Sequence, residues 1–191
     1  GQVVRRILIN NGGSWPVLSD ATQKLNHVLR MLHGLRRTIN RDDVTSRALH
    51  ILFEVFQFAE RISVVLRNEH GTDITVAAAV SRRADEEIQI CLPVVRSCMQ
   101  NAEAMLYVDH WKSDSEANSE LEDPAIRSIM CVPLVGLAGH SIGAIQIDSR
   151  NARRPLDKQK LEQLVVVSQV VSFAMEQAAE AEVVRAVPET N

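Results

Sequence analysis

The chain has 191 residues, of which 46% are hydrophobic, and a formal net charge of -3. This length suits one globular domain with additional helices, and the hydrophobic content is enough to bury a core, which excludes a disordered chain. The small negative charge and the lack of long Lys/Arg runs argue against a nucleic-acid surface.

No uninterrupted apolar stretch reaches the roughly 18 residues that a membrane span needs. No apolar signal-peptide core follows the two N-terminal arginines. We therefore expect a cytoplasmic protein without membrane contact. Cys91, Cys98 and Cys131 lack the close spacing of a zinc site, so we expect buried free thiols. Because Cys91 and Cys98 are about two helical turns apart, they are the one pair expected to lie near each other.

The first predicted helix follows a short apolar run in residues 3–11, which is either a strand or a linker remnant. The helix starts near Asp20, which can cap it. Its apolar positions form a heptad-like seam over about two heptads: Leu25, Val28, Leu32, Leu35 and Ile39. The polar residues Lys24, Arg30 and Arg37 are expected on the opposite face. Both a core helix and an exposed dimer-forming or signal-transmitting helix fit this pattern, and we favour the second.

A second helix is predicted from Asp42 or Asp43 to Phe56, and alternating strands at 62–67 and 74–80 follow, joined by a turn. A charged loop and a short extended piece at 88–91 precede a helix with Pro93 in its first turn. A strand at 104–109 then leads into a polar connection at 110–123. This order of elements indicates a mixed α and β domain.

The most informative segment is a hairpin of two strands at 127–134 and 141–149. In its second strand Ile145 and Ile147 point to one face, while Ala144, Gln146 and Asp148 point to the other. Gly143 permits a bulge or a close backbone approach inside this strand.

A long helix is predicted from Asp157 to Val183 or beyond, and it is apolar almost all round between Leu164 and Met175. Such a helix must be covered on more than one side. The sheet provides one cover, and either the first helix or a second subunit provides the other. We therefore predict a homodimer through the terminal helices. The expected interface residues are Leu25, Val28, Leu32, Leu35, Val171 and Met175.

From about residue 42 to 178 the chain resembles GAF domains. The hairpin and the Pro155-Leu156-Asp157 entry to the last helix carry the resemblance most strongly. The middle segment is most similar to GAF domains that follow a forkhead-associated domain in bacterial signalling and transcriptional regulators. A serine usually opens the middle helix there, whereas this chain has Cys91.

The resemblance implies an α+β fold with a six-stranded antiparallel sheet. Its N- and C-terminal helices cover one face, and a short helix with a lid loop covers the other. The implied organisation is a linker or partial upstream segment at 1–19, a dimerisation or signalling helix at 20–40, the GAF domain at 42–178 and the helix end with a tail at 179–191.

The resemblance also implies a sensory or regulatory module without enzymatic activity. A small molecule would bind on the lid-covered face, and the terminal helices would carry the signal to an output domain or a forkhead-associated domain of the full-length protein. The expected ligand-binding residues are Asp109, His110, Trp111, Arg127 and Ser128. Arg127 can pair with an anionic ligand or with acidic residues of the lid.

Two alternatives stay open. One is a dimerisation module that binds no ligand, and the other is an enzyme similar to free methionine sulfoxide reductases. The identity of a cofactor is unknown from the sequence. The Asn-Lys-Phe signature of cyclic-nucleotide-binding relatives is absent, and no cysteine for covalent bilin attachment occurs between His110 and Ile126. The histidines are dispersed, so no metal is expected.

Overall fold

The computed structural model describes residues 2–8, 21–36, 38, 40–68, 73–83, 88, 90–108, 126–151 and 156–186. Its strands are β1 (Gln2–Leu8), β2 (Arg61–Arg67), β3 (Ile74–Ser81), β4 (Glu103–Val108), β5 (Ser128–Val135) and β6 (Ser141–Ser149). They form one six-stranded sheet in the order β1-β4-β5-β6-β2-β3, and every neighbouring pair is antiparallel. This confirms the predicted sheet.

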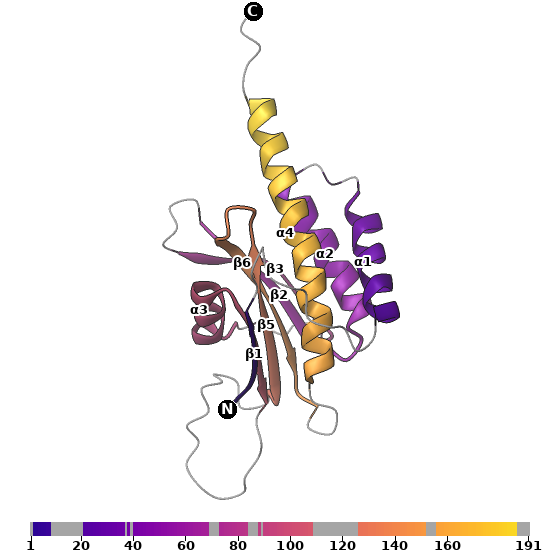
Figure 1. Cartoon of the computed structure of the whole chain (residues 1–191), viewed down its shortest axis with the longest axis vertical. Coiled ribbons are helices and arrows are strands. Elements are labelled where there is room, and N and C mark those ends of the chain that lie inside the picture. Colours follow the sequence, from indigo (N-terminus) through magenta and orange to yellow (C-terminus); the bar gives the residue numbers. More distant parts are fainter. Residues whose placement is uncertain are drawn as a thin grey trace, which may run out of the picture.

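Helices cover both faces of the sheet. The described helices are α1 (Ala21–Leu35), α2 (Arg41–Val55), α3 (Leu92–Asn101) and α4 (Lys158–Ala186). In Figure 1, α2 and α4 lie against one face, α1 lies outside them, and α3 covers the opposite face. The C-terminal turns of α4 extend past the other elements.

The edge strand β1 comes from the N-terminal run for which the sequence left a strand and a linker remnant open. It pairs with β4, from Gln2 opposite Val108 to Leu8 opposite Glu103. No strand occurs at the described positions 88, 90 and 91, so the short extended piece expected there does not contribute to the sheet.

Local signals explain where the helices begin. Asn40 caps α2, because its side-chain oxygen accepts a hydrogen bond from the amide of Asp43 at 2.8 Å. Pro93 occupies the first turn of α3, as predicted. Asp157 precedes α4 and accepts a hydrogen bond from the amide of Lys160 at 2.9 Å. The cap predicted at Asp20 lies outside the described residues.

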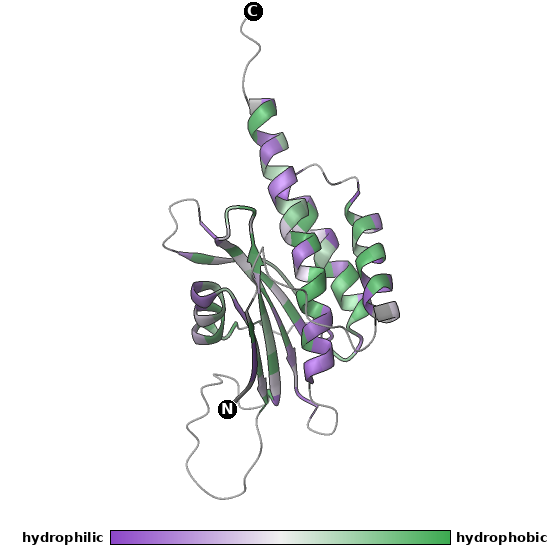
Figure 2. Cartoon of the chain, in the orientation of Figure 1, coloured by the Kyte–Doolittle hydropathy of each residue, from purple (hydrophilic) through white to green (hydrophobic). Residues whose placement is uncertain are grey.

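The main core fills the space between the sheet and the helices α2 and α4. Ile145 and Ile147 of β6 are fully buried in it, and Ala144 belongs to a second apolar cluster under α3. This confirms the alternation predicted for β6. Figure 2 shows the hydrophobic residues gathered where the sheet and helices meet, and also along α1 at the outside of the helical layer.

Gly143 permits the close approach of β6 to β2. A Cβ atom at this position would lie 2.3 Å from the backbone oxygen of Val65. We expect Gly143→Ala to lower the free energy of unfolding by about 2–3 kcal/mol, because the strands must separate locally. Urea unfolding measures the change. In the control Gly136→Ala, the new methyl group meets the side chain of Glu176, which can move, and the loss should be smaller.

The helix α1 is rotated relative to the predicted seam. Its buried residues are Lys24, Met31 and Leu35, at 1%, 1% and 6% exposure, whereas Leu25 and Leu32 are 57% and 47% exposed. The prediction that Lys24 lies on the solvent face is therefore wrong. Its Nζ atom lies 2.9 Å from Glu162 Oε2 of α4, and this buried ion pair draws the Lys24 side of α1 inward.

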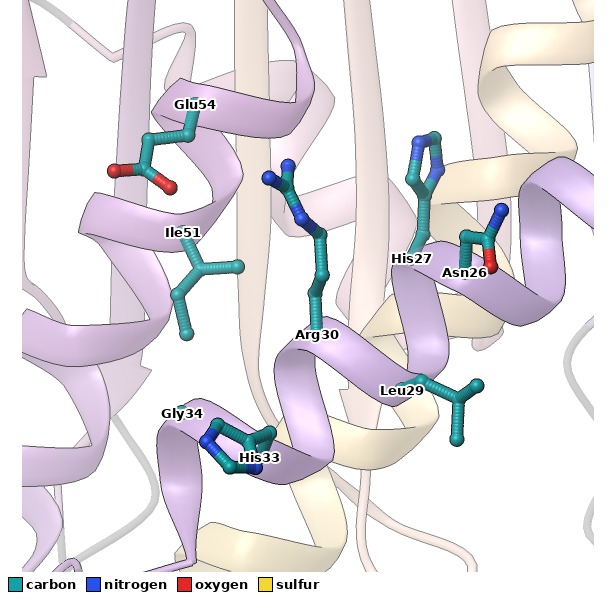
Figure 3. A pocket seen from close by; sticks show the side chains of 8 residues that line it. All are labelled: Asn26, His27, Leu29, Arg30, His33, Gly34, Ile51 and Glu54. Carbon is teal, nitrogen blue, oxygen red and sulfur yellow. The ribbon is translucent and has the colours of Figure 1, made fainter.

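The helices α1 and α2 meet at Gly34 and Ile51. A Cβ atom on residue 34 would lie 2.2 Å from the Cδ1 atom of Ile51, so glycine allows the helices to approach closely. Figure 3 shows this contact at one end of a groove between the two helices. The predicted seam position Ile39 and the predicted solvent-facing Arg37 lie outside the described residues.

Candidate ligand-binding face

The sheet face covered by α3 carries two transverse rows of side chains. Direct partners in antiparallel strands point to the same side of a sheet. The register places Arg61, Asp148, Ile129 and Tyr107 in one row, from β2 to β4. It places Ser63, Gln146, Cys131 and Met105 in the next. Both rows are therefore polar towards β2 and β6 and mostly apolar towards β5 and β4.

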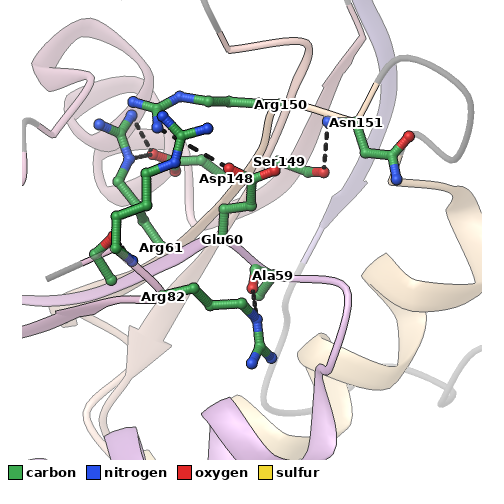
Figure 4. A network of polar contacts seen from close by, with 10 residues as sticks. Ala59, Glu60, Arg61, Arg82, Asp148, Ser149, Arg150 and Asn151 are labelled. Atoms are coloured by element: carbon green, nitrogen blue, oxygen red, sulfur yellow. Dashed lines mark hydrogen bonds and ion pairs between the residues drawn. The ribbon is translucent and has the colours of Figure 1, made fainter. Parts of the chain in front are cut away.

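A buried ion pair forms the polar end of the first row. Arg61 Nε donates a hydrogen bond to Asp148 Oδ2 at 2.8 Å, and Arg61 Nη2 lies 2.8 Å from the same oxygen (Figure 4). Both residues are 2% exposed. Each charge has lost its hydration, so each depends on the other for compensation. At the end of the sheet, Arg150 lies 4.0 Å from the carboxylate of Glu60.

Gln146 connects this ion pair to the start of α3. Its Nε2 atom donates to Asp148 Oδ1 at 3.0 Å, and its Oε1 atom accepts from the backbone amide of Cys91 at 3.1 Å. Cys91 is the residue before α3, and its own side chain makes no capping hydrogen bond. The beginning of α3 is thus tied to β6 by a side chain of the sheet.

The three cysteines are free and buried in the apolar cluster between α3 and the sheet. The expectation that Cys91 and Cys98 form the one near pair is wrong, because Cys98 of α3 meets Cys131 of β5. The pKa of Cys131 is raised well above its usual value, first by the side-chain hydrogen bond with Cys98 and then by burial. The electrostatic interactions with Cys98 and Asp148 raise it further. Cys131 is therefore held as a thiol, which is a poor nucleophile.

Of the five predicted ligand-binding residues, the structure describes two. Arg127 is half-buried directly before β5, and its amide donates to Ser149 O at 2.9 Å. Ser128 is fully buried and lies with Met130 on the face covered by α2 and α4. Its hydroxyl accepts a hydrogen bond from Leu156 N at 3.1 Å. The structure does not bring Ser128 to the α3 face. Asp109, His110 and Trp111 lie outside the described residues.

The six predicted interface residues divide into two groups. Leu35, Val171 and Met175 are buried in the core of the chain itself, so they are not available to a second copy in this conformation. Leu25 and Leu32 are exposed, and Val28 is half-buried. Further large apolar side chains are exposed on these helices: Leu29 of α1 at 53%, and Phe173, Val183 and Val184 of α4 at 52%, 66% and 73%.

Sequence reasoning missed the roles of Arg61, Gln146 and Asp148. A signal was present, because Gln146 and Asp148 alternate with isoleucines in a strand whose two neighbours are also strands. A central strand of a helix-covered sheet is buried on both faces, so its polar residues need partners. On sequence alone, Asp148 is interpreted only as the end of the strand.

The described part of the chain contains neither a metal-binding cluster nor a membrane-spanning helix. There, no group of three or more His, Cys, Asp or Glu side chains is placed to hold a metal ion. None of the described helices has the length and apolar character to cross a membrane.

Comparisons with known proteins agree on one fold. The sequence model of a family described as "GAF domain" matches residues 38–176. A search of curated proteins found no match. Among solved structures, residues 122 to 287 of a methyl-accepting chemotaxis protein align with a TM-score of 0.62 and 19% identity, covering 82% of this chain and 99% of that chain.

Two further solved structures illustrate the range of proteins that share this fold. The GAF domain from an Acinetobacter phosphoenolpyruvate-protein phosphotransferase aligns with a TM-score of 0.65 and 13% identity, covering 88% of this chain and 100% of that one. A free methionine-R-sulfoxide reductase from Neisseria meningitidis, in complex with its substrate, aligns with a TM-score of 0.62 and 16% identity, covering 86% and 96%. At these identities the likeness shows the fold.

Proposed function

The chain belongs to the GAF domain family, a family of sensory and regulatory modules in signalling proteins, and from this we propose that it binds a small molecule on the α3-covered face. The observation that carries the proposal is the buried polar end of the two rows beneath α3. Buried charged and polar groups need partners that compensate for the hydration they lose. Here they connect the sheet to the helix that covers it.

In this proposal the ligand lies at the other, apolar end of the face, near Arg127, Tyr107 and Ile129, while the buried polar end ties α3 to the sheet. Arg127 offers a planar guanidinium for an anionic group, and the proposed partners Asp109, His110 and Trp111 follow β4 directly in the sequence. A ligand there shifts the packing of α3 only by its difference in affinity for the two arrangements. Gln146 is the contact through which such a shift reaches β6.

A thermal-shift screen with nucleotides, amino acids and common metabolites tests this function. A ligand that binds only the folded chain raises the melting temperature, with about 2.7 kcal/mol of stabilisation at 100 times its Kd. We expect Arg127→Ala to abolish the shift and the exposed control Arg83→Ala to keep it. A chain that no compound stabilises, or an equal loss in both variants, would contradict the proposed site.

We propose a regulatory role without catalysis. The reductase with this fold is an enzyme, but the raised pKa and full burial of Cys131 favour an inert thiol in this chain. Incubation with free methionine sulfoxide and a thiol reductant should therefore produce no methionine. Formation of methionine at a rate that Cys131→Ala abolishes would reject a purely regulatory role.

A second proposed property is a homodimer through the exposed apolar residues of α1 and α4. Leu25, Leu29 and Leu32 follow one another at helical spacing, and all are about half exposed. An exposed apolar stripe of this kind is typical of an interface. The C-terminal turns of α4, with exposed Val183 and Val184, extend away from the sheet, and we propose that they carry the signal to an output domain.

We expect Leu25→Glu combined with Leu32→Glu to convert the dimer into monomers, because two charges would be buried in the apolar interface. Sedimentation velocity measures the mass. The control Leu137→Glu places a glutamate on an exposed leucine in the turn between β5 and β6 and should leave the dimer intact. An unchanged mass in the double variant would reject this interface.

A further inference from the structure

A groove between α1 and α2 lies on the opposite side of the sheet from α3 (Figure 3). Its volume is about 780 Å³, within the range of small-molecule sites. Ile51 and Gly34, where the two helices touch, lie at one end of it. The groove is open to solvent and belongs to the helical layer, so it is separate from the α3-covered face.

One wall of the groove is a row of hydrogen-bond donors from a single helix. Asn26, His27, Arg30 and His33 all belong to α1 and line the groove. Asn26, Arg30 and His33 are spaced by four and three residues, so their side chains lie on one side of the helix, with His27 beside them. Figure 3 shows the Arg30 side chain extending along the groove between His27 and the α2 residue Glu54.

The Arg30 guanidinium forms no ion pair with the described part of the chain, although Glu54 lines the same groove. The side chains of Arg30 and His33 have no hydrogen-bond or ion-pair partner among the described residues. The acidic group of the opposite wall, Glu54, lies 3.3 Å from His50 Nε2 on its own helix. The Arg30 guanidinium and the His33 ring are thus left available for a ligand.

We infer that this groove binds the oxyanion of a small molecule, a carboxylate or a phosphate group, with Arg30 as the main partner. The planar guanidinium can donate two parallel hydrogen bonds to such a group. The ring nitrogens of His33 and the amide of Asn26 add donors beside it. Leu29 and Ile51 provide an apolar surface for the remainder of the molecule.

A ligand in this groove would contact both α1 and α2. Leu29 lines the groove and is also part of the exposed leucine stripe of α1, so an occupied groove lies next to the proposed dimer interface. The inference does not depend on a ligand under α3, because the groove and the α3 face lie on opposite sides of the sheet.

A titration of the whole chain with inorganic phosphate and, separately, with acetate tests the inference, with sodium chloride as the reference at equal ionic strength. NMR spectra follow the ring resonances of His27 and His33. We expect saturable shifts with phosphate, acetate or both, and the two arms show which oxyanion is preferred. Arg30→Gln should weaken binding about tenfold or more, while Arg96→Gln, on exposed α3 surface, leaves it unchanged.

Arg30 is exposed, so the variant is expected to fold, and an unchanged melting temperature verifies this. His33→Gln is a second variant and should weaken binding by a smaller factor. Shifts that equal those in sodium chloride, or equal losses in Arg30→Gln and Arg96→Gln, would overturn the inference. Arg127→Ala separates the two sites, because it should leave the phosphate and acetate titrations unchanged.

Discussion

Replacing Asp148 by alanine should lower the free energy of unfolding by about 3–5 kcal/mol, because the substitution leaves the Arg61 guanidinium charged and 2% exposed. It also removes the acceptor for Gln146, whose amide bridges to the start of α3. We therefore expect the helix α3 to loosen together with the loss of global stability. Urea unfolding measures the first effect, and amide hydrogen exchange in α3 measures the second.

A double variant shows whether stability requires the ion pair itself, or only that neither buried charge is left without a partner. Arg61→Met with Asp148→Leu should recover most of the lost stability, since apolar replacements of buried ion pairs are often neutral or better. The surface control is Arg47→Ala, which breaks an exposed i,i+4 pair with Asp43 at 2.8 Å and should cost about 0.3–0.5 kcal/mol. A double variant as unstable as Asp148→Ala would contradict this account.

Replacing Lys24 by alanine should cost about 3 kcal/mol, because it leaves the carboxylate of Glu162 at the buried contact between α1 and α4. Lys158, at 3.5 Å from Glu162, compensates only part of the loss, since it approaches from the solvent side with 58% of its side chain exposed. We expect α1 to separate from α4 before the sheet unfolds. Hydrogen exchange in α1, compared with exchange in β5, detects this separation.

The same ion pair predicts a dependence on pH. Burial alone would raise the pKa of Glu162, but the hydrogen bond and charge of Lys24, with a contribution from Lys158, lower it below its usual value of 4.5. The folded state therefore binds this proton less readily than the unfolded state. Its contribution to stability is complete above about pH 4.5 and is lost as the pH falls through the lowered pKa.

Unfolding curves measured from about pH 3 to about pH 7 span the carboxyl range and verify this direction. Glu162→Gln should show a smaller loss of stability at acidic pH than the unchanged chain. The same acid-induced loss in both proteins would mean that Glu162 does not contribute to this pH dependence.

The strand β6 connects the two faces of the sheet. It carries Gln146 and Asp148 on the α3 side and Ile145 and Ile147 on the side of α2 and α4. A change in α3 packing that displaces Gln146 also displaces a strand on which the helical layer rests. Since β5 contacts α4 and α4 contacts α1, two successive contacts link the sheet to the proposed dimer surface.

The sequence predicted the strands at 127–134 and 141–149 and both faces of the second one. Alternation was sufficient there, because the period of two assigns each side chain to a face as soon as the strand is recognised. The close approach at Gly143 was also predicted, since a glycine inside a strand often marks a bulge or a backbone that passes nearby. The start of α3 at Pro93 followed from the missing amide hydrogen of proline.

The orientation of α1 illustrates what local patterns cannot decide. Its sequence contains two stripes at helical spacing, one with Leu25 and Leu32 and another with Lys24 and Met31. Hydrophobicity favours burying the leucines, but Glu162 of α4 offers a buried partner to Lys24, and Glu162 lies 138 positions away in the chain. Only the packing of α4 on the sheet brings that carboxylate to α1.

By itself, then, the sequence determined the order of the elements after residue 20, because periodicity and turn residues act within short segments. The six-stranded antiparallel sheet followed from the resemblance to GAF domains. The tertiary structure alone decided the burial of the Arg61–Asp148 pair, the meeting of Cys98 with Cys131, and the side of α1 that faces solvent. Each of these joins residues far apart in the chain, and each depends on a partner that a local pattern does not contain.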